Sequence, residues 1–305
     1  MTSGNSTSSR VGRVCQHQPM PLARLLLSPP ACRDPETLRT AVVGRTVLVT
    51  GASSGIGEAA ARQLGEAGAE VLLLARRAER LEEVAAAIRA QGGRAHVYSA
   101  DLADPVQVRA VAARVGAKHP DLWAVVSNAG RSVRRPALEG AARDDLGRLL
   151  AVNFGGPAAL LLALLPGMLG RGGVIVNVSS VSARHVAAPR WGAYQGSKAG
   201  FDLWLHALGA EVRGRGVRVA SVYLPLVRTP MIAPTRAYRF LPALSADDAA
   251  RAVLLPLVRP VVRVAPWWLR PVEVAGLLAP GLLGRGLARL EDAERRWGRR
   301  EEDRR

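Results

Sequence analysis

The sequence predicts an α/β fold, in which a doubly wound parallel sheet of about seven strands carries helices on both faces. Short apolar runs rich in β-branched residues alternate with longer helical stretches of Ala, Leu and Arg. Runs that are apolar throughout are typical of strands covered on both faces, and their alternation with helices is typical of a parallel sheet. Residues that favour the start of a helix occur at the expected positions; for example, Asp104 is a suitable N-cap and Pro105 suits the first helical position.

The elements follow in order from about residue 41. Asp104 is the expected N-cap of one helix, and Ser245 with Asp248 resembles a capping box that starts another. After Pro266 the chain is apolar, basic and punctuated by prolines. The expected strands are 46–50, 70–75, 123–128, 173–179 and 217–223.

Length and composition limit the class of protein. The chain has 305 residues and is 49% hydrophobic, which allows a sizeable core and excludes general disorder. Only two cysteines occur, Cys15 and Cys32. They exclude a disulfide framework and a cysteine-rich metal site.

A net charge of +17 would favour binding to nucleic acid or to anionic lipid. However, only two of the 42 basic residues are lysines, Lys118 and Lys198, and the arginines are dispersed along the chain. This pattern indicates a general arginine bias. We therefore expect no nucleic-acid partner.

Three regions are expected: a flexible leader (1–40), one α/β domain (41–270) and a C-terminal helical extension (271–305). The longest uncharged stretch, 151–170, is interrupted by prolines and glycines, which favours a buried or interface helix over a membrane span. Near the N-terminus, the apolar segment 22–30 contains Arg24 and is not followed by a signal-peptide cleavage site. We expect a cytoplasmic protein, with contact at a membrane surface as an alternative.

A glycine-rich turn follows the first strand and precedes a helix. Such a turn lets the backbone approach a pyrophosphate, whose charge is favoured by free amides at the helix start. The expected cofactor-binding residues of the turn are Gly51, Ser53, Ser54, Gly55, Ile56 and Gly57.

The second strand ends at Ala75, followed by Arg76 and Arg77, where an NAD-binding protein usually has an acidic residue. A guanidinium group suits the additional 2′-phosphate of NADP. The sequence therefore predicts NADP(H) as the cofactor.

Tyr194 and Lys198 stand four residues apart on an expected helix, so their side chains share one face. A nearby cation favours the phenolate form, which suits a tyrosine for proton transfer. We expect Lys198 to lower the pKa of Tyr194.

These motifs occur in a characteristic order: 50–57, then Ser127-Asn-Ala-Gly130, Asn153, Ser179-Ser180 and the Tyr194/Lys198 pair. From about residue 41 to 265 the chain thereby resembles the short-chain dehydrogenase/reductase family. The resemblance implies a Rossmann-type fold, an NAD(P)-dependent enzyme, and assembly into dimers or tetramers, for which 141–170 is the candidate surface.

The resemblance also implies residue roles. Tyr194 would be the general acid/base, Ser180 would hydrogen-bond the reacting oxygen, and Lys198 would bind the nicotinamide ribose. Asn153 would hold a water in a proton relay. Further cofactor contacts are implied for Asp101, Leu102, Asn128, Ala129, Gly130, Pro225, Val227 and Thr229.

Two departures from the family pattern stand out. Ser180 lies fourteen residues before Tyr194, one more than is usual, so Ser182 remains an alternative catalytic serine. The usual Pro-Gly after the sixth strand is Pro225-Leu226 here, which leaves the backbone of that loop in question.

The segments 128–135, 188–194, 224–235 and 241–249 resemble the bacterial long-chain fatty acyl-CoA reductases of this family. That resemblance implies NADPH-dependent reduction of an acyl thioester to an aldehyde. Two alternatives remain open: an alcohol or ketone dehydrogenase acting on another lipid or secondary metabolite, and a non-catalytic NADP-binding regulator.

Residues 251–290 contain six arginines and one acidic residue among many Leu, Val and Trp. This segment could line an acyl channel or rest on anionic lipid; the plainer alternative is a helix that packs on the sheet. Arg131, Arg134 and Arg135 could meet CoA phosphates, or could be solvated loop residues.

Overall fold

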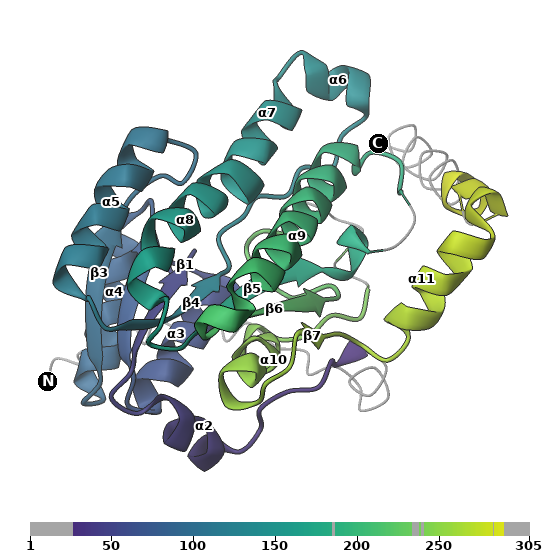
Figure 1. Ribbon diagram of the computed structural model, residues 1–305. Coiled ribbons are helices and arrows are strands. Elements are labelled where there is room, and N and C mark those ends of the chain that lie inside the picture. Colours follow the sequence, from purple (N-terminus) through teal and green to yellow (C-terminus); the bar gives the residue numbers. More distant parts are fainter. Residues whose placement is uncertain (1–26, 185–186, 234–237, 239–240, 283, 290–305) are drawn as a thin grey trace, which may run out of the picture.

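A parallel sheet of seven strands forms the centre of the protein (Figure 1). The computed structural model describes residues 27–289, except 185–186, 234–237, 239–240 and 283. The strand order is β3-β2-β1-β4-β5-β6-β7, and every neighbouring pair is parallel. The strands are β1 (Thr46–Thr50), β2 (Glu70–Ala75), β3 (Arg94–Ser99), β4 (Leu122–Ser127), β5 (Gly173–Ser180), β6 (Val217–Leu224) and β7 (Arg263–Val264).

Helices cover both faces of the sheet. Buried side chains from α2, α3, α4 and α10 form a core with one face, and those from α5, α8 and α9 form a second core with the other. The helices are α2 (Pro35–Val42), α3 (Gly55–Glu66), α4 (Ala78–Ala90), α5 (Pro105–Lys118), α6 (Ala137–Ala141), α7 (Asp145–Leu150), α8 (Gly156–Met168), α9 (Gly192–Val212), α10 (Ala246–Val258) and α11 (Leu269–Leu278). A π-helical turn, η1 (Ala151–Gly155), joins α7 to α8, and the 3-10 turns are η2 (Val181–Ala183) and η3 (Arg213–Arg215).

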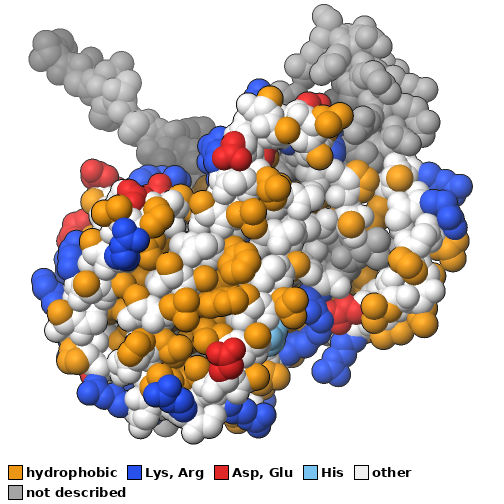
Figure 2. Space-filling view, turned by 45° about the horizontal axis from the view of Figure 1, so that its top comes forward, with side chains coloured by type: hydrophobic (Ala, Val, Ile, Leu, Met, Phe, Trp, Pro, Cys, Tyr) orange, Lys and Arg blue, Asp and Glu red, His pale blue; other side chains and the backbone are white. Residues whose placement is uncertain are grey.

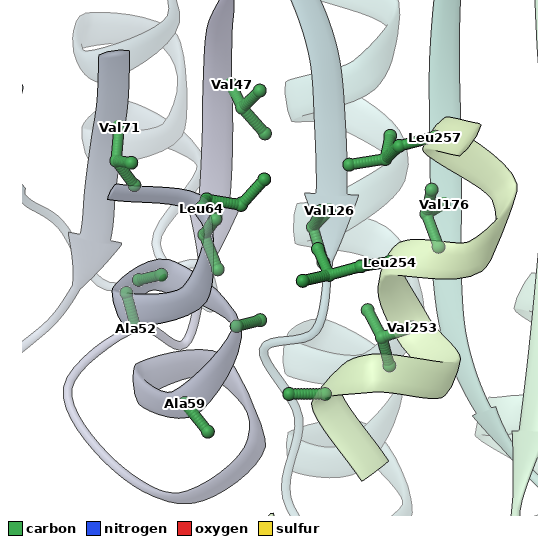
Figure 3. Packing of buried hydrophobic residues seen from close by; sticks show 14 of the residues in the cluster. Val47, Ala52, Ala59, Leu64, Val71, Val126, Val176, Val253, Leu254 and Leu257 are labelled. Atoms are coloured by element: carbon green, nitrogen blue, oxygen red, sulfur yellow. The ribbon is translucent and has the colours of Figure 1, made fainter. Parts of the chain in front are cut away.

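The first core shows why the strands are apolar throughout. Val47, Val126 and Val176 come from three neighbouring strands and meet Leu64 of α3 and Leu254 of α10 (Figure 3). The adjacent positions Leu48, Val125 and Ile175 belong to the core on the opposite face. Both faces of each central strand are thus buried, which requires an apolar residue at almost every position.

The predicted fold class is confirmed, and the five predicted strands agree with β1, β2, β4, β5 and β6 within one or two residues. The edge strand β3 was missed. Its sequence RAHVYS alternates between exposed and buried positions, as expected of an edge strand, and so lacks the continuous apolar signal. The other edge strand, β7, is only two residues long.

The expected helix starts are present. Asp104 accepts hydrogen bonds from the amides of Val106 and Gln107, and the Ser245 hydroxyl accepts one from the amide of Asp248 at 3.0 Å. These contacts satisfy amides that have no partner within the helix.

Packed structure begins earlier than the predicted leader allows. Asp34 caps α2, Pro35 occupies its first turn, and Leu38 and Val42 are buried in the first core. Asp34-Pro35 is the same signal as Asp104-Pro105, so residues 35–40 belong to the fold. Residues 1–26 of the expected leader and 290–305 of the expected extension lie outside the described residues.

The segment Asp145–Met168 is one helical run that is long and apolar enough to cross a membrane by length and composition alone. Half of its most apolar window is buried in the protein. Leu160, Leu161 and Leu164 pack in the second core, and α8 contacts α5. This burial is that of a core helix, as the prolines and glycines of the stretch indicated.

Candidate active site

A groove of about 890 Å³ lies at the carboxyl ends of the strands, near the neighbouring strands β1 and β4. The chain that follows β1 runs to one face of the sheet, and the chain that follows β4 runs to the opposite face. Ligands of open α/β sheets bind at this topological position. The residues of the groove that the sequence singled out are Gly51, Ser53, Ser54, Gly55, Ile56, Arg76, Arg77, Asp101, Leu102, Asn128, Ala129, Gly130 and Thr229.

The glycine-rich turn has no space for side chains at two of its glycines. Gly51 has φ +67°, and a Cβ atom there would lie 2.8 Å from Asn128 Nδ2. A Cβ on Gly57 would overlap the carbonyl of Gly51, so Gly57 packs behind the turn and is absent from the residues that line the groove. The first turn of α3 faces the groove without a side-chain cap, which suits a bound phosphate.

Thr50 and Asn128 hold this turn in place. The Asn128 side-chain amide donates to the carbonyl of Thr50 at 3.0 Å, and the Thr50 hydroxyl accepts from the amides of Asn128 and Ala129 at 3.0 and 2.9 Å. Thr50 belongs to the motif 50–57, but the sequence predicted no role for its side chain. Its hydroxyl fixes the wall of the groove to the end of β1.

The two arginines after β2 lie on the groove. Arg77 donates to the Ser53 hydroxyl at 3.4 Å, so it lies beside the glycine-rich turn. Arg76 lies 3.7 Å from the carboxylate of Asp101. A dinucleotide fits this groove, and cations border it at the end of β2, where an NAD-binding protein usually has an acidic residue.

A second cavity, of about 630 Å³, adjoins the groove. Both are lined by Ile56, Asn128, Gly130, Arg131, Thr229 and Met231, so they form one continuous depression. Ser180, Tyr194 and Lys198 line the second cavity, as do Pro225 and Val227. These last two therefore lie on the cleft side of the loop rather than along the groove.

Ser180 and Tyr194 contact each other in this cleft. The Ser180 hydroxyl lowers the pKa of Tyr194, although the two side chains come from the end of β5 and the first turn of α9. Ser182 lines the same cavity, where its hydroxyl donates to Ser180 Oγ at 2.9 Å and its amide donates to the same atom at 3.2 Å. Of the two candidate serines, Ser180 is the one whose hydroxyl lowers the pKa of Tyr194.

The pKa of Tyr194 is raised by burial, which outweighs the lowering effect of the Ser180 hydrogen bond. This direction is opposite to the one predicted from the Tyr194/Lys198 spacing. The reason is that the cleft removes the phenol from water, and desolvation disfavours its charged form. Tyr194 is therefore a protonated phenol at neutral pH.

Lys198 is buried, and its ammonium donates to the carbonyl of Val178 at 3.1 Å. Burial lowers its pKa to about 8, and the nearby carboxylate of Asp202 opposes this shift. The ammonium is thus charged at neutral pH but close to losing its proton.

Asn153 lies in the π-helical turn η1 and is buried. Its Nδ2 donates to the carbonyl of Arg131 at 2.9 Å and to Ser197 Oγ at 3.0 Å, while its Oδ1 accepts from the amide of Arg131 at 2.7 Å. These bonds fix the segment after Gly130 against α9. Single π-helical turns often occur at functional sites.

The sequence missed the buried polar network beneath Lys198. Asp202 accepts hydrogen bonds from Ser221 Oγ at 2.6 Å, Tyr223 OH at 2.8 Å and Asn177 Nδ2 at 3.1 Å. It follows Lys198 by four residues, so the spacing that linked Tyr194 to Lys198 could also have identified Asp202. Ser197, which joins Asn153 to the carbonyl of Tyr194, gave no such signal.

Apolar and aromatic side chains form the outer part of the cleft. The Trp191 ring lies 5.6 Å from that of Tyr194 and is stacked with that of Tyr238 at 6.4 Å. Met231 and Ile232 line the same cavity. Of the arginines on the 131–135 loop, Arg135 is paired with the buried carboxylate of Asp145 and so has a structural partner.

A dinucleotide groove that opens directly onto a protonated tyrosine and a buried ammonium group defines an NAD(P)-dependent oxidoreductase. The comparison with known families agrees with this class. Residues 45–239 match the family described as short chain dehydrogenase, and the chain belongs to it.

Relatives of this chain include two proteins named fatty acyl-CoA reductase. The protein from Acinetobacter baylyi is 40% identical over 246 residues, which cover 80% of this chain and 83% of the relative. The protein from Mycobacterium tuberculosis is 38% identical and covers 80% of this chain and 82% of the relative. A metagenomic short-chain oxidoreductase, solved in complex with NADP, is 32% identical with a TM-score of 0.64, covering 74% of this chain and 97% of its own.

Proposed function

We propose that this protein is an NADPH-dependent reductase of apolar carbonyl compounds and that its substrate is a fatty acyl-CoA, which it reduces to the aldehyde. One observation carries the proposal. The Ser180–Tyr194 pair lies where the dinucleotide groove meets a cleft lined by Trp191, Met231 and Ile232. A carbonyl that enters between these two sides would have its polar end at the hydroxyl groups and its chain against the apolar wall.

The proton chemistry follows from the pKa directions. Tyr194 is protonated at neutral pH because burial raises its pKa, so it suits a general acid that donates to a carbonyl oxygen during reduction. Ser180 would donate a hydrogen bond to the same oxygen as negative charge develops there. NADPH, when bound, supplies the hydride.

Lys198 and Asn153 support this reaction. The charged Lys198 lies against Gly130, where a Cβ atom would come within 3.2 Å of Nζ, and so could bind the nicotinamide ribose at the inner end of the groove. Asn153 holds the Arg131 backbone beside it, and its place in a water-mediated proton relay remains a prediction.

The preference for NADPH rests on Arg76 and Arg77, both of which lie on the groove. The preference for acyl-CoA rests on the apolar cleft and on the two relatives named fatty acyl-CoA reductase. Reduction of the thioester consumes one NADPH and one proton, and it releases the aldehyde and the free CoA thiol. Arg134 lines the cleft and is placed to meet the phosphates of CoA.

The proposal is tested by following NADPH oxidation with long-chain acyl-CoAs, fatty aldehydes and ketones in parallel. The acyl-CoA should give the highest kcat/KM and release one CoA thiol per NADPH. Preference for a ketone or an alcohol would instead indicate a dehydrogenase of another lipid or secondary metabolite. Tyr194→Phe should bind NADPH but not turn over. Binding of NADPH by the unaltered protein without turnover of any of these compounds would indicate a regulator.

Assembly and location belong to the same proposal. Hydrophobic side chains gather on the face of the molecule that includes α7, α8 and α9 (Figure 2), with Leu146, Leu162 and Leu203 exposed there. This face suits contact with a second copy of the chain in a cytoplasmic homo-oligomer. Sedimentation of the unaltered protein and of Leu203→Asp would test it, with the variant expected to dissociate.

The exposed apolar side chains Val274, Leu277, Leu278 and Leu282 would let α11 and residues 279–282 lie on a membrane surface. Arg270 and Arg285 would then face anionic lipid headgroups. Cosedimentation with phosphatidylglycerol vesicles should be weakened by Leu278→Asp and unchanged by Leu203→Asp. Equal binding by both variants would exclude α11 as the contact.

A further inference from the structure

Two histidines and a glutamate meet at the end of the sheet opposite to the candidate active site. Glu70 is the first residue of β2, His96 lies near the start of β3, and His119 directly follows α5. The groove lies at the carboxyl ends of these strands, so this group is remote from it. Figure 1 shows α5 beside the β3 end of the sheet.

The parallel register brings the three side chains together. Glu70 pairs with Arg94, and Leu72 pairs with His96, so Glu70 and His96 belong to the same face of the sheet. Helix α5 packs on this face, and the His119 amide donates to the carbonyl of Val115, which fixes the imidazole at the end of the helix.

The ligand atoms have the spacing of a metal site. Glu70 Oε1 lies 2.9 Å from His96 Nε2 and 3.3 Å from His119 Nδ1, and all the ligand atoms lie within 4.8 Å of one another. A Zn²⁺ ion bonded at about 2.0–2.2 Å places its tetrahedral ligands roughly 3.3–3.6 Å apart. We propose that Glu70, His96 and His119 form a binding site for a divalent transition-metal ion of the Zn²⁺ type.

The chemistry of the three ligands selects this class of ion. Two imidazoles and one carboxylate suit Zn²⁺ and similar ions, whereas Ca²⁺ and Mg²⁺ prefer oxygen ligands alone. The His96 side chain is 47% exposed, while that of His119 is 8% exposed. The ion can therefore enter from the His96 side, where water would complete its coordination.

Tyr98 provides a hydrogen-bond partner for the ring nitrogen of His119 that would not bind the metal, as is usual for metal-binding histidines. Its hydroxyl lies 2.8 Å from His119 Nε2, the ring nitrogen that faces away from Glu70. With a metal on Nδ1, Nε2 carries the proton and donates to the Tyr98 oxygen, which holds the ring in its ligating orientation. The site would tie β2, β3 and the end of α5 together, and so stabilise the edge of the sheet.

The test uses the full chain, free of any histidine tag. Isothermal titration with ZnCl₂ should reveal one ion per chain that depends on His96, and MgCl₂ should not replace it. Zn²⁺ at about a hundred times its Kd should raise Tm by roughly 4–5 °C. Co²⁺ should give the visible absorption of a four- or five-coordinate site.

His96→Ala is the main variant, because this exposed side chain can be removed without a cavity in the core; it should weaken Zn²⁺ binding at least about tenfold. Arg94→Gln is the matched control. Arg94 lies 3.9 Å from Glu70 and repels a cation, so this variant should bind Zn²⁺ as tightly as the unaltered protein or more tightly. Undetectable Zn²⁺ binding, or equal binding by the unaltered protein and His96→Ala, would overturn the site and reduce the cluster to a hydrogen-bonded trio.

Discussion

Asp202 lies one helical turn after Lys198 on α9, and its carboxylate is the charge that keeps the buried Lys198 ammonium protonated near neutral pH. Burial alone would shift the pKa of Lys198 further below its ordinary value. Asp202 is itself held by Asn177, Ser221 and Tyr223. The charge state of the candidate active site therefore depends on a network beneath the cleft.

This relationship predicts the alkaline limit of activity. Lys198 has a pKa of about 8, so it loses its charge as the pH rises through that value, and the reductase rate should fall there. Loss of the proton from Tyr194 contributes only at higher pH, because its pKa is raised. The profile of kcat/KM against pH, measured in the reductive direction, checks this. A flat profile up to about pH 9.5 would contradict it.

Asp202→Asn should move this limit to lower pH. The neutral amide keeps the size of the side chain but removes the negative charge that raises the pKa of Lys198. The alkaline limb should shift by about one pH unit, corresponding to roughly 1.4 kcal/mol of lost interaction. Ser221→Ala is the matched control, because it removes a neighbour of Asp202 without removing the charge. A shift toward higher pH in Asp202→Asn would contradict this role.

Sequence spacing identified the chemistry of α9 but not its surroundings. Tyr194, Lys198 and Asp202 follow one another at intervals of four residues, so a helical pattern alone places them on one face of α9. The contact between Ser180 and Tyr194 is different, because it depends on how α9 packs against the end of β5.

The same limit applies elsewhere in the chain. Continuous β-branched runs predicted the central strands, whereas the alternating pattern of β3 did not stand out. The π-helical turn that carries Asn153 has no signal in the residues themselves. His96 and His119 meet only because α5 returns along the sheet, which local pattern cannot indicate.

Lys198→Met should abolish activity while it stabilises the fold. The folded-state pKa of about 8 lies below the ordinary lysine value of 10.5, so holding the charged form in the fold at pH 7 costs about 3 kcal/mol. Methionine avoids that cost but loses the hydrogen bond to the Val178 carbonyl, worth roughly 1 kcal/mol.

Urea unfolding at pH 7 should therefore give a higher free energy of unfolding for Lys198→Met. The unaltered protein should gain stability as the pH rises from about 8 to 10.5, because the unfolded chain then binds more protons than the folded one. The variant should lack this gain. A less stable variant at pH 7 would contradict the argument.

Arg76→Asp should exchange the cofactor preference. A carboxylate at the end of β2 repels a 2′-phosphate and can accept a hydrogen bond from the free ribose hydroxyl of NADH. The ratio of kcat/KM for NADPH to that for NADH should fall at least about tenfold. Arg80→Asp is the control, since Arg80 is absent from the residues that line the groove. An unchanged ratio in Arg76→Asp would remove the argument for NADPH.

Arg134→Gln should raise KM for acyl-CoA but not KM for a fatty aldehyde. If Arg134 meets the phosphates of CoA, its loss raises KM for acyl-CoA several-fold, by about 1 kcal/mol, and leaves KM for a fatty aldehyde unchanged. Steady-state kinetics with both substrates check the difference, and an equal rise for both would place Arg134 outside CoA recognition.

The two serines at the end of β5 should differ in their effect on the chemical step. Ser180 acts on Tyr194 directly, whereas the Ser182 hydroxyl donates to Ser180 Oγ and the Ser182 backbone carbonyl accepts from Gln195 Nε2. Removing a donor that meets the developing negative charge costs about a hundredfold or more in kcat. Removing Ser182 leaves that donor in place. Ser180→Ala should therefore lose at least about ten times more activity than Ser182→Ala, with NADPH binding retained in both, and the reverse order would assign the role to Ser182.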